Sequence, residues 1–165
     1  MEVRNLADCW KLSDKIGVPE DQIIHAFGIS VDIERLQGLD DLSVEDLWDE
    51  YHKSTDNYRK NSLLVHIVLH SDADLDTQFK AWAQAKQGST VEYAISQIII
   101  QEVVDTKDLV VVYLKFPAGS LGKYMVLSKI LESAENIDKV KWVVQDAPSM
   151  SELKFKAIRK LASML

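Results

Sequence analysis

The sequence is poor in cysteine, proline and glycine, and it has no long hydrophobic run. Its single cysteine, Cys9, excludes an intramolecular disulfide and a zinc site made from several cysteines, which favours a reducing compartment. The apolar stretches are far shorter than the roughly 18 residues that cross a bilayer, and the start of the chain carries acids in place of a signal-peptide core. We therefore expect a cytoplasmic protein without a membrane segment.

Basic residues are in deficit, because the chain has 19 Lys and Arg against 26 Asp and Glu, a net charge of -7. Residues 1–60 contain 14 acidic and 7 basic residues, whereas residues 61–165 contain 12 of each. An acidic segment repels nucleic acid and anionic lipid, and it attracts basic proteins at short range. The expected partner is therefore another protein, which a basic surface would suit, and neither a nucleic acid nor a membrane. A solvated acidic face without any partner is the alternative.

The first third of the chain predicts three short helices. Gly17 and Gly28 are placed to end the first two helices, and Ser43 is placed to cap the third. The polar stretch 54–61 that follows predicts a linker. The predicted domains are an acidic helical segment, 1–58, and an α/β domain, 62–165.

Three short runs rich in β-branched residues predict strands: 63–69 (LLVHIVL), 109–116 (LVVVYLKF) and 140–144 (VKWVV). Helical periodicity lies between and after these runs, so the order predicts an α/β fold with a mainly parallel sheet, of three strands or more, flanked by helices. A helix at 63–70 is the alternative, and it would make the front half an all-helical bundle of death-fold type. We expect neither an internal repeat nor a low-complexity tract.

The segment 12–27 (LSDKIGVPEDQIIHAF) resembles a helix-turn-helix motif, with Leu12 and Ile16 as apolar residues before the turn. The resemblance implies DNA binding through the second helix. A DNA reader presents cations and amides at the start of that helix, where this chain has Glu20 and Asp21. The charge therefore disfavours nucleic-acid binding, and a helical packing motif is the simpler interpretation.

A cluster of possible metal ligands follows the first predicted strand. His70, Asp72 and Asp74 would lie at its carboxyl end, where oxygen ligands suit a hard cation such as Mg²⁺, and His66 would face the same side as His70. Helix capping by Asp72 or Asp74 is the competing explanation, because Asp is strongly preferred at helix starts.

A glycine-bearing turn follows the second predicted strand, and Gly119, Ser120, Gly122 and Lys123 in it form a candidate phosphate site. The spacing is not that of a Walker A motif. The order of strand, serine-bearing turn, helix and strand is similar to that of the STAS domains of anti-sigma-factor antagonists, whose serine is read by a partner kinase. A tight connection that needs glycine is the alternative.

These patterns favour a small soluble regulatory or inhibitory protein that works by protein-protein binding through its acidic N-terminal segment. The partner-binding residues we predict are Asp40, Asp41, Asp49 and Glu50. The chain shows no complete catalytic set and implies no cofactor. A small phosphate- or Mg²⁺-handling enzyme, using the Asp cluster and the Gly119–Lys123 turn, is the alternative from another class. The oligomeric state stays open.

Overall fold

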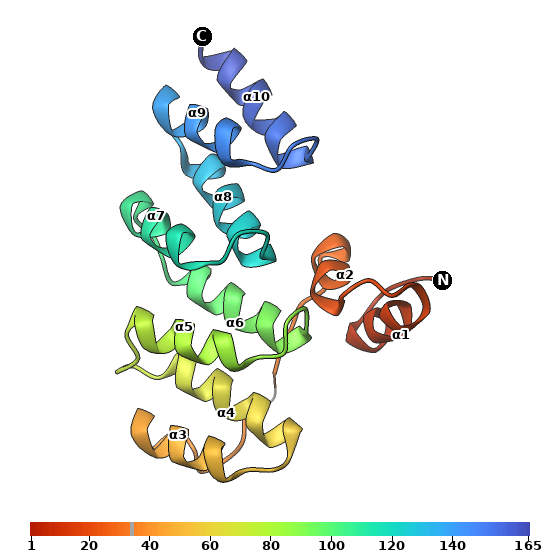
Figure 1. Ribbon diagram of the computed structural model, residues 1–165, viewed down its shortest axis with the longest axis vertical. Helices are drawn as coiled ribbons and strands as arrows, with labels where there is room; N and C mark the ends of the chain where they lie inside the picture. Colours follow the sequence, from red (N-terminus) through yellow and green to blue (C-terminus); the bar gives the residue numbers. More distant parts are fainter. Residues whose placement is uncertain (34) are drawn as a thin grey trace. The chain divides into compact units, whose positions relative to one another are not determined.

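The computed structural model describes residues 1–33 and 35–165, and this part of the chain contains ten helices and no strand (Figure 1). The predicted α/β fold with a parallel sheet is therefore wrong. None of the described helices is long and apolar enough to cross a membrane. The helices are α1 (Leu6–Ile16), α2 (Glu20–Phe27), α3 (Val44–Lys53), α4 (Asn57–Leu69), α5 (Leu75–Gln84), α6 (Thr90–Gln101), α7 (Thr106–Lys115), α8 (Leu121–Ser133), α9 (Ile137–Asp146) and α10 (Glu152–Met164).

All three predicted strands are helices. In α4 every residue from 62 to 68 is buried, and a helix that is buried on all sides has the same continuous apolar run as a buried strand. In α7 the buried residues follow helical spacing instead: Leu109, Val112, Tyr113 and Phe116. In α9 the predicted strand 140–144 likewise buries its first and fourth residues. The three runs were predicted as strands because they are rich in β-branched residues, although the spacing in two of them is helical. Tertiary packing overrides the strand propensity of β-branched residues.

The predicted helices are confirmed where a cap or a glycine marks their ends. Gly17 and Gly28 follow α1 and α2 in the left-handed conformation, and the Ser43 side chain accepts a hydrogen bond from the Asp46 backbone N–H, 3.1 Å away. The predicted linker at 54–61 is shorter than expected, because α4 already begins at Asn57.

The chain divides into two compact units, Met1–Ile99 and Ile100–Leu165. The division predicted near residue 58 lies inside α4, within the first unit. The first unit contains α1 to α5 and most of α6, and in it α1 packs on α2 and α4 packs on both α3 and α5. The second unit contains α7 to α10, each of which packs on its neighbour in the sequence.

The helices recur with a fixed spacing, so the expectation of a chain without repeats is also wrong. α3, α5, α7 and α9 begin at Val44, Leu75, Thr106 and Ile137, each 31 residues after the one before. α6, α8 and α10 begin at Thr90, Leu121 and Glu152 with the same spacing. The chain from α3 onward therefore consists of four helical hairpins, and tandem helical hairpins of this length are typical of repeat proteins.

The repeat is one of structural roles. Short polar side chains cap the first helix of each hairpin: Ser43, Asp74, Asp105 and Asn136. At the start of the second helix in three of the hairpins, a serine side chain accepts a hydrogen bond from the backbone N–H three residues later. These serines are Ser89, Ser120 and Ser151. The residue before each of these serines has a positive φ: Gly88, Gly119 and Met150. The serines are of one type, but the other caps and the positive-φ residues differ in type, so the period is visible in the structure and weak in the sequence.

Candidate functional site

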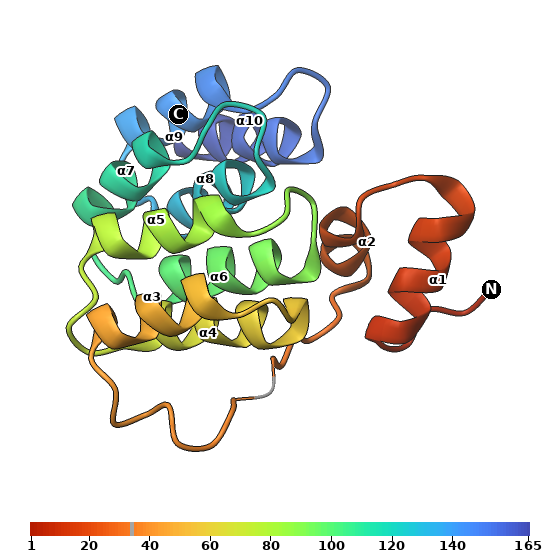
Figure 2. The same ribbon diagram turned by 60° about the horizontal axis from the view of Figure 1, so that its bottom comes forward.

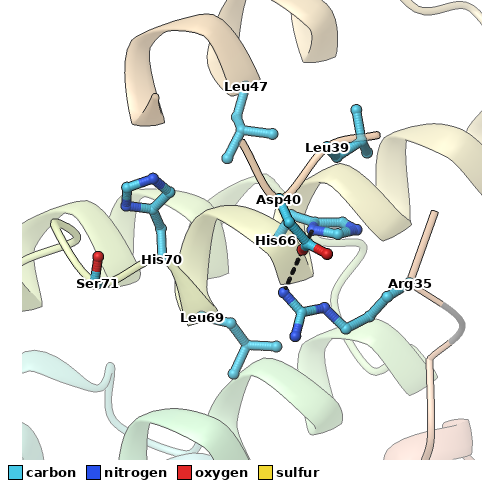
Figure 3. A pocket seen from close by; sticks show the side chains of 8 residues that line it. All are labelled: Arg35, Leu39, Asp40, Leu47, His66, Leu69, His70 and Ser71. Carbon is cyan, nitrogen blue, oxygen red and sulfur yellow. Dashed lines mark hydrogen bonds and ion pairs between the residues drawn. The ribbon is translucent and has the colours of Figure 1, made fainter. Parts of the chain in front are cut away.

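The first unit contains a pocket of about 230 Å³ between the loop before α3, the two helices of the first hairpin and the residues after α4 (Figure 3). Leucines form its apolar walls, and an arginine, an aspartate, two histidines and a serine provide its polar groups. The lining residues are Arg35, Leu39, Asp40, Leu47, His66, Leu69, His70 and Ser71.

Three of the polar residues are connected through one oxygen of the Asp40 carboxylate. The Arg35 guanidinium donates to the Asp40 carboxylate over 2.8 Å, and the same carboxylate oxygen lies 3.5 Å from Nδ1 of His66. Figure 3 shows how this connection reaches from the loop to α4. Arg35 and Asp40 are exposed while His66 is 3% exposed, so the loop places an ion pair over a buried imidazole.

Burial determines the protonation of His66. Desolvation lowers the pKa of His66 below its ordinary value, the nearby Arg35 charge lowers it further, and Asp40 opposes both. In a neutral imidazole ring one nitrogen is a donor and the other is an acceptor. Nε2 is buried and has no hydrogen-bond partner within the described part of the chain. The pocket thus holds a neutral histidine with one unsatisfied atom.

The predicted metal ligands serve the turn after α4 instead. The Asp72 backbone N–H donates to Nδ1 of His70 over 3.0 Å, and Nε2 of His70 lies 3.0 Å from the Leu42 carbonyl oxygen. The Asp74 side chain caps α5 by accepting from the Thr77 backbone N–H at 2.8 Å. Among residues 1–33 and 35–165, no three His, Cys, Asp or Glu side chains gather as a metal site would require.

The four predicted acidic contact residues do not form one patch. Asp40 lines the pocket, and Asp41 is exposed in the same loop. Glu50 lies 3.3 Å from Arg59 in an exposed ion pair. Asp49 is exposed on α3, two residues after the pocket-lining Leu47, and therefore about 200° further round the helix.

The predicted phosphate turn connects α7 to α8, and its side chains have structural roles. Gly119 takes the left-handed conformation, and Ser120 caps α8. Gly122 lies against the ring of Phe116. Lys123 donates from Nζ to the Phe116 carbonyl oxygen over 3.1 Å. Both sets of predicted enzyme residues were placed at the edge of a parallel sheet, and that reason to bring them together disappears with the sheet.

Lys123 belongs to a polar and aromatic cluster in the second unit. Its Nζ lies 4.1 Å from the centre of the Tyr113 ring, which meets the Trp142 ring edge-on at 4.9 Å. The Tyr113 hydroxyl donates to Asp146 over 3.0 Å. Burial, this hydrogen bond and the Asp146 charge raise the pKa of Tyr113 to about 12. The phenol is therefore protonated at neutral pH, and the cluster joins α7, α8 and α9.

The segment that resembles a helix-turn-helix motif packs against the start of α6 (Figure 2). Glu20 accepts from both the backbone N–H and the hydroxyl of Thr90, and the Trp10 indole donates to the same hydroxyl over 2.9 Å. The Asp21 backbone N–H donates to the Gly88 carbonyl oxygen over 3.0 Å. The helix end that would enter a DNA groove is thus held by α6 and the turn before it.

Three of the eight pocket residues were candidates in the sequence, namely His66, His70 and Asp40, and the others were not. His66 and His70 were paired by their spacing of four, which places them on one face of a helix as well as on one face of a strand. Arg35 and Leu39 come from a loop without periodicity or a motif, so no sequence signal connects them to α4. No protein-family model, curated protein or solved structure matches the chain.

Proposed function

We propose that the chain is a small regulatory protein that acts by binding another protein, and that the pocket between the loop before α3 and α4 receives an anchoring side chain of that partner. The pocket itself is the observation that carries the proposal. Its volume of about 230 Å³ is below the roughly 300–1,000 Å³ of sites for drug-sized ligands, so it suits a side chain better than a cofactor.

The composition of the pocket agrees with an anchor site at a protein interface. Leu39 and Leu47 are buried, while Leu69 is 38% exposed and offers apolar surface to a partner. Most of the pocket's lining surface is polar, so an anchoring side chain that forms hydrogen bonds as well as packing against Leu69 suits it best. Asp40 is paired with Arg35 at the pocket, and Asp41 is exposed in the same loop, so a partner whose anchor is flanked by lysine or arginine would meet Asp41.

The charge pattern adds a longer-range contribution that is spread over the first unit and is not confined to the pocket. Residues 1–60 carry the whole excess of negative charge, and Asp41 and Asp49 are exposed to solvent there. Exposed charges at the edge of an interface chiefly raise the association rate, and salt screens them. We therefore expect fast, salt-sensitive association, with the pocket contributing more to the lifetime of the complex than the acids do.

The test blocks the pocket without unfolding the protein. Leu69→Arg places a longer charged side chain at a partly exposed wall, and Val111→Arg is the matched control because Val111 is 47% exposed in the second unit. Partners captured from a native lysate by the wild-type chain are identified and produced pure. The pocket variant is expected to bind them at least about tenfold more weakly, which is the effect of losing one buried anchor.

A second pair of variants tests the acids. One variant neutralises the predicted contact residues, D40N/D41N/D49N/E50Q, and its control neutralises four exposed acids of the second unit, D108N/E132Q/E135Q/D138N. The first is expected to slow association at low salt, and the control is expected to leave it unchanged. Equal binding by the Leu69→Arg variant and the wild type would disprove the pocket proposal, and equal losses in both charge variants would disprove a specific acidic surface.

A further inference from the structure

The last helix of the chain carries a second apolar stripe, on the side that it does not bury. Leu153 and Ala157 form the buried side of α10. Phe155, Ile158 and Leu165 are 37%, 45% and 85% exposed, and Ala162 is exposed between them. The spacing of these four residues is three, four and three, which is the a and d spacing by which one helix packs along another.

The repeat shows that this stripe is a helix-packing surface. The residues of α8 that lie 31 positions earlier are Tyr124, Leu127, Leu131 and Ala134. The last three are buried, with exposures of 2%, 6% and 6%. In the second unit α8 packs on α7 and on α9, and this face of α8 is buried there.

The residues beside the stripe are basic. Lys154 precedes Phe155 and Arg159 follows Ile158, so the two cations take the positions that flank an a and d seam on its two sides. Lys154 is half-buried and Arg159 is exposed, with an exposed ion pair of 3.0 Å to Glu152. Flanking charges select the partner of a packed helix, and here they select an acidic one.

We propose that the stripe Phe155–Ile158–Ala162 of α10, together with Leu165 directly after the helix, binds an acidic amphipathic helix of another protein. This surface is distinct from the pocket of the first unit. A second copy of α10 is a poor occupant, because either orientation of two such helices places Lys154 and Arg159 near cations of the copy. The exposed face of α3 is a poor occupant too, since Glu45, Asp46 and Asp49 give it charge without a matching apolar stripe.

The probe is a labelled synthetic helix with leucine at its a and d positions and glutamate at the flanking positions. Its control is the same helix with lysine in place of the glutamates. Fluorescence anisotropy with the full chain is expected to show binding of the acidic probe, weakened by salt, and at least about tenfold weaker binding of the basic probe.

Two variants of the chain make the test specific. Ile158→Gln removes apolar surface at an exposed position and is expected to weaken the acidic probe about tenfold or more, whereas Val104→Gln, at a position 92% exposed, leaves it unchanged. K154E/R159E is expected to reverse the preference of the chain between the two probes, so that the basic probe binds more tightly than the acidic one. Equal binding of both probes, no binding of either, or a dimer of the chain that Ile158→Gln dissociates would overturn the proposal.

Discussion

The contact between Phe116 and Gly122 offers a direct test of the repeat. Phe116 is larger, and Gly122 smaller, than the residues that lie 31 positions before and after it in the chain. A Cβ added at Gly122 would lie 2.7 Å from Cδ1 and 2.8 Å from Cζ of Phe116, whose ring is 1% exposed. Because the ring is buried, moving it away from the added Cβ would disturb neighbouring core side chains. Gly122→Ala is therefore expected to destabilise the protein by about 1–3 kcal/mol, the usual cost of overpacking a core.

The counterparts of this pair show how the strain can be relieved. The residues 31 positions before and after Phe116 are Ala85 and Ala147, and the residues 31 positions before and after Gly122 are Val91 and Leu153. The other hairpins thus place the large side chain on the second helix and the small one before it. Phe116→Ala alone empties the site and is expected to cost about 3–5 kcal/mol.

The double variant F116A/G122V copies the arrangement of the second hairpin. It is expected to be more stable than the sum of the two single changes implies, with a coupling free energy of about 2 kcal/mol or more between the sites. Urea unfolding followed by circular dichroism measures the free energies. Hydrogen exchange of residues 106–133 shows whether α7 and α8 open separately from the rest, as repeats can. Additive effects of Gly122→Val and Phe116→Ala would refute the shared structural role.

Three further predictions concern single residues. Met150 is 82% exposed with φ of 61°, where its counterparts are glycines, so Met150→Gly is expected to raise the free energy of unfolding by up to about 1 kcal/mol in urea denaturation, with Met150→Ala as the neutral control. The pKa of His66 is lower in the folded state than its ordinary 6.5, so the unfolded state takes up the proton first as the pH falls. The free energy of unfolding therefore decreases below pH 6.5. His66→Gln is expected to reduce this decrease, as measured by thermal unfolding at several pH values. The pKa of Tyr113 is raised from 10 to about 12, so its contribution is complete below pH 10 and is lost as the pH rises towards 12, a loss that Tyr113→Phe is expected to remove from the alkaline unfolding profile.

The ends of the helices were predictable because they depend on local chemistry. Ser43 and the glycines at 17 and 28 satisfy backbone groups within a few residues, and the structure places all three at helix ends. The identity of α4 was not predictable from the same window. Residues 62–68 are buried on every side, so the apolar run carries no period that could separate a helix from a strand.

The α7 helix was predictable in principle, and its misassignment has a specific cause. Leu109, Val112, Tyr113 and Phe116 have the spacing of one helix face, and Val111 and Leu114 between them are 47% and 69% exposed. Because these two exposed residues are also apolar, the sequence shows a continuous apolar run in which the helical spacing of the buried residues cannot be seen. The pocket is different in kind, since Arg35 and Asp40 reach His66 only through the path of a loop, which no local pattern specifies.

The 31-residue spacing connects the two proposed binding surfaces. His66 and Leu69, which line the pocket on α4, correspond to Arg159 and Ala162 on the outer side of α10. The residues that correspond to Leu69 in α6 and α8 are Ile100 and Leu131, and both are 6% exposed. At the position of Leu69 the second helix is therefore buried in the two middle hairpins and exposed in the first and the last. Burial of an apolar side chain at this position stabilises the two middle hairpins, so a partner that covers Leu69 or Ala162 gains the same kind of apolar burial.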